Sequence, residues 1–329
     1  MTLISMLLAL IIERLAVRSD AWQARPYCQA YLKLTAGSGL TKLAEHQLGR
    51  YLWILLPGLL VALLLHLLDN RLLTLVVNTL VLLVGIGCWH YRQLYKQYLN
   101  AQERGDEEAA YLAMQQIRHD SHSDIDSSNG LTLVWLNFRY YAAVVFWFLV
   151  LGAFGVITYA LLRHLNEQTQ TEGAEPVAAS SDTFAATDDA LAETETGAAG
   201  TADAVTVDEP VVFAETAADM PDSSAAVAKK DALSCMLHRA DWFPARLFGL
   251  GFALVGHFSR ASNALLGYFL DFTANNEQVV KDVARAAEPL PEEVVNGIED
   301  TSSMVQLSKR NMLFFLAFTA ILTLTGWLG

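Results

Sequence analysis

Polar and small side chains recur along one face of an otherwise apolar segment. Their positions alternate in steps of three and four, the spacing that places residues on one face of an α-helix. In chain order they are Arg246, Gly249, Ala253, Gly256, Arg260, Asn263 and Gly267. Ionisable residues at membrane depth usually face a bundle interior or a wet cavity. The pattern predicts a polar cleft for an anionic ligand; the alternative is a packing face whose arginines reach the surface or pair with acids.

The residues before this segment have a simpler interpretation as the start of a helix at a membrane surface. Asp241 can cap such a helix, and Pro244 suits its first turn. Trp242 and Phe243 are typical of the membrane interface. Arg246, one turn further on, is left unexplained. Asp241, Asn137, Arg139 and His257 complete the set of candidate ligand-binding residues, although a cationic flank such as Arg139 is ordinary beside a membrane span.

The sequence carries no motif for a metal, a nucleotide or a catalytic nucleophile. Cys28, Cys88 and Cys235 lack the spacing of a metal site. The stretch "HDSHSD" at 119–124 has metal-capable residues but is predicted to be a solvated loop. P-loop, G-x-S-x-G and H-E-x-x-H patterns are missing. We therefore expect no cofactor, no metal and no catalytic residue, and no basic face for nucleic acid.

The elements that must position these residues are membrane helices. Apolar residues make up 53% of the chain and charged residues 17%, a balance more apolar than in soluble proteins. Spans of about 20 apolar residues are predicted at 51–68, 72–89, 140–162 and 311–328, with a fifth candidate at 246–269. The run at 2–12 is too short to span and is expected to be a retained membrane helix. The predicted fold is an all-α, polytopic membrane protein with four to five spans.

Basic residues predict how the spans are oriented. Residues 13–50 and 90–139 are rich in Lys and Arg, which places both in the cytoplasm and the hairpin at Asp69 outside. A single crossing at 140–162 then puts the following stretch outside. A crossing at 246–269 returns the next basic segment to the cytoplasm, so that five spans are favoured over four.

Two segments outside the spans differ sharply from each other. Residues 91–139 read as amphipathic helices broken at Gly105, with Asp106 as an N-cap, and predict a small cytoplasmic cap. Residues 166–230 hold 14 acidic residues and only two lysines, and their composition predicts disorder. The expected divisions are 1–50, 51–90, 91–139, 140–165, 166–230, 231–270, 271–310 and 311–329.

Three stretches resemble one bacterial family. "MTLISMLLALIIERL", "LVWLNFRYYAAVVFWFLVLGAFG" and "LHRADWFPARLFGLGFALVGHF" look like the AmpE family of inner-membrane proteins. The resemblance covers the chain except the acidic stretch. It implies a multi-pass protein of the bacterial inner membrane that modulates β-lactamase induction and is linked to peptidoglycan recycling. Its partners would be the lipid bilayer, an anionic cell-wall fragment or lipid, and another membrane protein.

AmpE proteins are in turn similar to CobD/CbiB, the membrane synthases of cobalamin biosynthesis, which gives an alternative function. "QERGDEEAA", "NFRYYAAVVFWF" and "DWFPARL" resemble motifs of that family. The acids that the synthases carry are not matched, however: Leu136 stands before the shared Asn137, and Glu13-Arg14-Leu15 replaces a Gly-Asp-Pro. These departures favour a protein that is not an enzyme.

Overall fold

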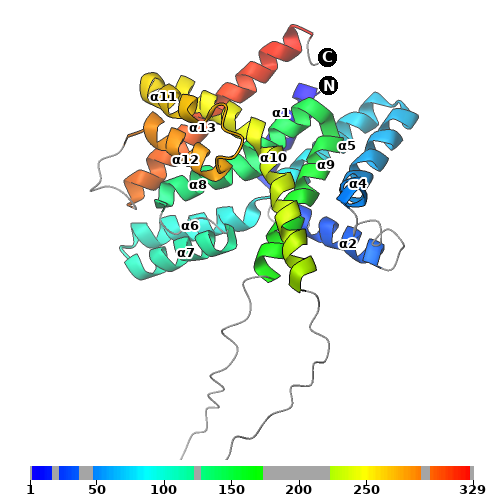
Figure 1. Ribbon diagram of the computed structural model, residues 1–329. Coiled ribbons are helices and arrows are strands. Elements are labelled where there is room, and N and C mark those ends of the chain that lie inside the picture. The colour runs from blue at the N-terminus through cyan, green and yellow to red at the C-terminus, as the bar shows by residue number, and fades with distance from the viewer. Residues whose placement is uncertain are drawn as a thin grey trace, which may run out of the picture.

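The computed structural model describes residues 2–16, 22–36, 47–121, 127–172, 223–289 and 297–326, and these contain helices and no strand. The helices are α1 (Thr2–Ala16), α2 (Ala24–Ala36), α4 (Gln47–Leu68), α5 (Arg71–Ile86), α6 (Trp89–Glu103), α7 (Glu107–Ser121), α8 (Asn129–Asn137), the π-helical turn η2 (Phe138–Ala142), α9 (Ala143–Glu172), α10 (Ser223–Val255), α11 (Phe258–Tyr268), α12 (Asn276–Ala287) and α13 (Ile298–Leu324). Figure 1 shows α9 and α10 at the centre, with α4 and α5 on one side and α11 to α13 on the other. The all-α expectation is confirmed.

Three helical stretches of the described chain are long and apolar enough to cross a membrane: Gly49–Leu68, Asn129–Gln170 and Ile298–Leu324. A fourth is possible if α5 and α6, which meet at an angle of 48°, count as one broken span. Leucines of α4 and α5 stay exposed, among them Leu63, Leu67 and Leu72, as expected for helix faces that contact lipid. The protein is a helical membrane protein.

The stretch Asn129–Gln170 folds back on itself. Gly152 has φ 64° and ψ −146°, which interrupts the helix. The Arg163 guanidinium lies 4.1 Å from the centre of the Tyr140 ring and donates to the Arg139 carbonyl at 3.1 Å. In a straight helix these residues would be about 35 Å apart. The two halves are therefore antiparallel, and Figure 1 shows the bend of α9 at the end opposite to α6 and α7.

This turn departs from the predicted single span at 140–162. Both ends of Asn129–Gln170 lie at the same end of the molecule. The prediction that the acidic stretch lies outside the cell assumed a single crossing, so it no longer follows. The core of that stretch, residues 173–222, lies outside the described residues.

Two predictions about the segment around Arg246 are wrong. Asp241 does not cap a helix, and Pro244 is not in a first turn, because α10 already begins at Ser223 and contains both residues. The segment 246–269 is not one helix either: α10 ends at Val255, and α11 begins after His257. The spacing of three and four residues keeps side chains on one face only within a single helix. The predicted polar stripe is therefore interrupted between α10 and α11.

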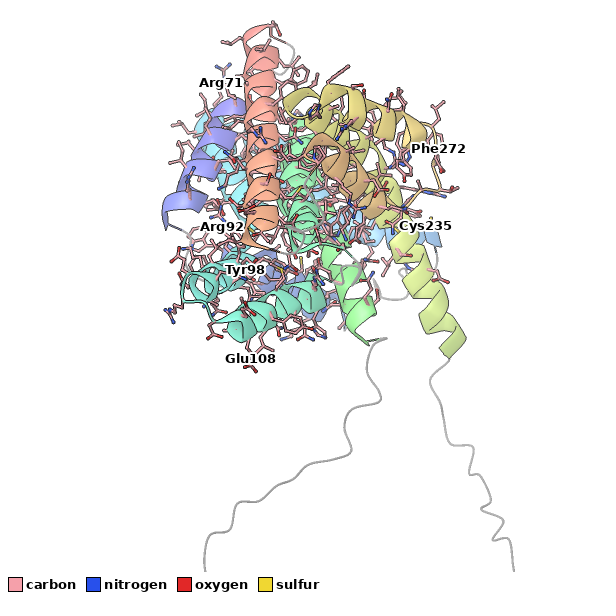
Figure 2. All side chains as sticks on the ribbon, turned by 90° about the vertical axis from the view of Figure 1, so that its left-hand side faces the viewer. Arg71, Arg92, Tyr98, Glu108, Cys235 and Phe272 are labelled. Atoms are coloured by element: carbon pink, nitrogen blue, oxygen red, sulfur yellow. The ribbon has the colours of Figure 1, made fainter. Side chains whose placement is uncertain are left out.

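Within the cap predicted at 91–139, α6 and α7 form a helix pair, whereas residues 129–139 belong to α8 and η2, and α8 packs against α12 and α13. Gly105 separates them with φ 72°, a left-handed conformation that favours glycine. The Asp106 carboxylate accepts a hydrogen bond from the Ala109 backbone N–H at 3.0 Å, which confirms the predicted N-cap. Tyr98 is 1% exposed in the core between the two helices. Figure 2 places Tyr98 and Glu108 together at the end of the molecule opposite to Arg71.

The N-terminal helix α1 packs within the bundle and is tied to the cap. Glu13, only 6% exposed, forms an ion pair with Arg92 of α6 at 2.8 Å. It also accepts a hydrogen bond from the Tyr141 hydroxyl at 2.9 Å. A buried carboxylate needs such partners because its desolvation is costly. Glu13 thus joins α1, α6 and η2.

Candidate functional site

Arg246 is a structural clamp between α10 and the segment before α12. Its guanidinium donates to the Asp271 carbonyl at 2.8 Å and to the side-chain oxygen of Asn276. It also stacks on the Trp242 ring at 4.8 Å. These contacts use the charge and the planar shape of the side chain. The polar face was interpreted either as a ligand-binding cleft or as a packing face, and the contacts of Arg246 fit the packing face.

The remaining residues of the predicted face lie apart from Arg246. Arg260 and Asn263 are exposed on α11, and His257 is exposed just before it. The break after Val255 separates them from α10. The structure therefore does not bring Arg246, Arg260 and Asn263 into one cleft.

A polar cleft does exist, beside the N-terminal half of α10. Its volume is about 550 Å³. Asp241 and Arg139, both predicted candidates, line it. The other lining residues are Trp135, Asn166, Gln170, Ser234, Cys235, Leu237, His238, Phe272, Thr273, Asn275, Asn276 and Glu277. Figure 2 shows Cys235 and Phe272 from its rim on the same flank of the molecule.

Three buried polar atoms of the cleft lining have no hydrogen-bond partner among the described residues. They are Nε1 of Trp135, Nε of Arg139 and Oδ1 of Asn166. The three side chains are 5%, 7% and 3% exposed, respectively. A buried donor or acceptor without a partner costs about 1–3 kcal/mol. The cleft lining thus contains two donors and one acceptor without a partner among the described residues.

Asp241 introduces a titratable group into the same wall. It is 3% exposed and accepts a hydrogen bond from the Tyr159 hydroxyl at 2.8 Å. Burial raises its pKa to about 6, while the charge of Arg139 and the Tyr159 hydrogen bond act in the opposite direction. The charge of the cleft thus changes within the range of pH that cells encounter.

A second arginine, Arg163, does not line the cleft but contacts the backbone of Arg139, which does. Sequence analysis did not identify Arg163 as a site residue. Arg163 directly follows the apolar run predicted at 140–162, and it is 4% exposed. It donates to the Gly85 carbonyl at 3.3 Å as well as to the Arg139 carbonyl. It fixes the backbone of Arg139 and so the direction of that side chain.

The opposite wall is held by His238 and Asn276, which sequence analysis also missed. The Asn276 amide donates to the His238 carbonyl at 2.8 Å, and His238 Nε2 donates to the Phe272 carbonyl at 3.0 Å. Neither residue stands out by spacing, because they come from different helices. Asn137 is half-buried with its Oδ1 unpartnered, and it does not line the cleft.

The described residues contain no group of three or more His, Cys, Asp or Glu side chains that could hold a metal ion. The cleft lining joins one arginine and two carboxylates, Asp241 and Glu277, with amide and aromatic side chains.

Comparison with known proteins identifies the family. The family model described as "Regulatory signalling modulator protein AmpE" matches residues 1–178 and 218–329. The chain belongs to the AmpE family. It is also similar to Protein AmpE of Shigella flexneri, with 27% identity over 99% of each chain. No solved structure matches.

The AmpE match also bears on the two functions left open by the sequence. It extends over both ends of the chain and omits residues 179–217, inside the acidic stretch. It favours the signalling family over the cobalamin synthases. Leu136, which stands where the synthases have an acid, is buried among apolar residues.

Proposed function

We propose that this protein is an inner-membrane signalling modulator of the AmpE type. It adjusts β-lactamase induction to the state of peptidoglycan recycling, and it does so by binding an anionic ligand in the cleft beside α10. The family match and the membrane helices support the first part. The cleft supports the second.

The observation that carries the ligand is the set of three unpartnered atoms on Trp135, Arg139 and Asn166. Arg139 supplies a permanent positive charge, and its main chain is fixed by Arg163. A hydrogen bond to a charged group is worth about 1.5–3 kcal/mol. An anion that accepts a hydrogen bond from Arg139 would satisfy a donor that has no partner among the described residues.

Deletion of the gene in its host, followed by complementation, tests this function. Wild-type protein should restore β-lactamase induction and the pools of soluble cell-wall fragments, whereas Arg139→Gln should not. Arg239→Gln, which removes an exposed arginine of α10 outside the cleft lining, is the matched control. Unchanged induction and unchanged fragment pools in the deletion strain would disprove the proposal.

A further inference from the structure

A second groove, with an apolar lining, lies one helical turn from the polar cleft along α10. The groove has a volume of about 340 Å³ and lies between α9, α10 and α13. Val145 and Leu149 come from α9, Pro244 and Leu247 from α10, and Phe315 from α13. Its lining residues are apolar apart from Thr319, whose hydroxyl is bonded to the Phe315 carbonyl.

The cleft and the groove follow one another along the same two stretches of helix. Arg139 lines the cleft, and Ala142, one turn further, lines the groove. On α10, Asp241 lines the cleft and Pro244 the groove. Three residues correspond to a rise of about 5 Å. The surface thus changes from polar to apolar over a single helical turn on both walls.

A ligand that matches this sequence of surfaces has a polar anionic head and an apolar tail. Arg139 and Trp135 offer donors to the head, and Asn166 offers an acceptor. The groove offers only apolar surface to the adjoining part of the ligand, and burial of each methylene group there contributes about 0.8 kcal/mol. A soluble anion would leave the groove unused.

We propose that the cleft and the groove form one site for an anionic membrane lipid, whose phosphorylated head lies on Arg139 and whose chain lies between α9, α10 and α13. The inference rests on the proposed anionic cleft and names its ligand class. The cleft is large enough for a head that carries a polyol or sugar beyond the phosphate. Asn166 then accepts a hydrogen bond from such a hydroxyl group.

Native mass spectrometry of the full chain in detergent tests the lipid site directly. The protein is titrated with dioleoyl phosphatidylglycerol, with dioleoyl phosphatidylcholine and with soluble glycerol 3-phosphate. We expect phosphatidylglycerol to bind at least about tenfold more tightly than phosphatidylcholine, because both carry a phosphodiester anion but the cationic choline of phosphatidylcholine cancels its net charge and is repelled by Arg139. Glycerol 3-phosphate, which lacks the chain, should bind much more weakly than phosphatidylglycerol.

Two kinds of variant separate the head from the tail. Arg139→Gln should weaken the binding of phosphatidylglycerol about tenfold or more. Trp135→Phe removes one donor with little change in shape, and it keeps the test decisive if Arg139→Gln fails to fold. Leu247→Trp fills the groove and should weaken the lipid likewise. Leu254→Trp, on the exposed face of α10, and Arg239→Gln are the controls and should bind as wild type.

The outcomes distinguish this inference from the function on which it rests. Binding of glycerol 3-phosphate that depends on Arg139, with lipid binding unchanged by Leu247→Trp, would overturn the lipid site and leave the anionic cleft standing. Equal affinity for the two lipids would overturn the lipid site as well. If no probe depends on Arg139 or Trp135, both proposals fail.

Discussion

The packing of the folded-back stretch against α5 makes Gly85 sensitive to a single methyl group. A Cβ at Gly85 would lie 2.4 Å from Cγ1 of Val156 and 3.3 Å from Cγ1 of Val144. These two valines come from opposite sides of the turn at Gly152. Overpacking of this kind costs about 1–3 kcal/mol, whereas replacing a helical glycine by alanine gains about 0.5–1 kcal/mol. Gly85→Ala should therefore lower the free energy of unfolding by up to about 2.5 kcal/mol.

A double-mutant cycle shows whether the clash is the cause. Val156→Ala removes the atom that a Cβ at Gly85 would meet, so Gly85→Ala should be neutral or slightly stabilising in that background. Reversible unfolding of the purified protein in mixed detergent micelles measures all four free energies. Gly267→Ala, where a Cβ meets nothing within 4 Å, is the matched control. Equal losses from Gly85→Ala with and without Val156→Ala would refute the antiparallel packing of the two halves.

Three other measurements follow from the structure. Cys235 is exposed, whereas Cys28 and Cys88 are buried and burial raises the pKa of Cys28 to about 11; maleimide at pH 7.5 should therefore give one adduct, on Cys235, by mass spectrometry. Asp241 has a pKa raised from 3.8 to about 6, so it stabilises the fold fully below pH 3.8 and less as the pH rises through 6. The thermal unfolding temperature of the wild type should fall between pH 3.8 and 6 relative to that of Asp241→Asn. If the unfolding temperatures of the two proteins change with pH in parallel, this assignment is contradicted. Figure 2 places Glu108 and Arg71 at opposite ends of the molecule, so an impermeant thiol reagent should reach Glu108→Cys and Arg71→Cys from opposite sides of the membrane; labelling of both from one side would exclude this topology.

Local sequence patterns predicted the helices well. Asn70 receives hydrogen bonds from the Leu72 and Leu73 backbone N–H groups at 3.0 and 3.3 Å, and it starts α5 where the hairpin was expected. The cap helices α6 and α7 are also local features, since an amphipathic stripe and an N-cap are contained in a few successive residues. The AmpE family was recognisable from motifs of the same kind.

The same local patterns could not predict how distant parts of the chain pack against each other. The run around Gly152 is apolar on both sides, so hydropathy alone cannot separate one span from two antiparallel halves. Arg246 finds its partners in Asp271 and Asn276, which are 25 and 30 residues away, and its packing role depends on that contact. Arg163 ends an apolar run, as a surface anchor does, but the fold-back buries it against Tyr140.

The ends of α9 and α10 bear on how this family can vary in length. Asn166 and Gln170 near the end of α9 line the same cleft as Ser234 and Cys235 near the start of α10. Lengthening a connection between two neighbouring helix ends destabilises a fold only slightly, because each doubling of the length of a flexible loop costs about 0.6 kcal/mol of closure entropy. The family model passes over residues 179–217, within this connection. The bundle can thus accept an added segment of dozens of residues at this point without any change in its packing.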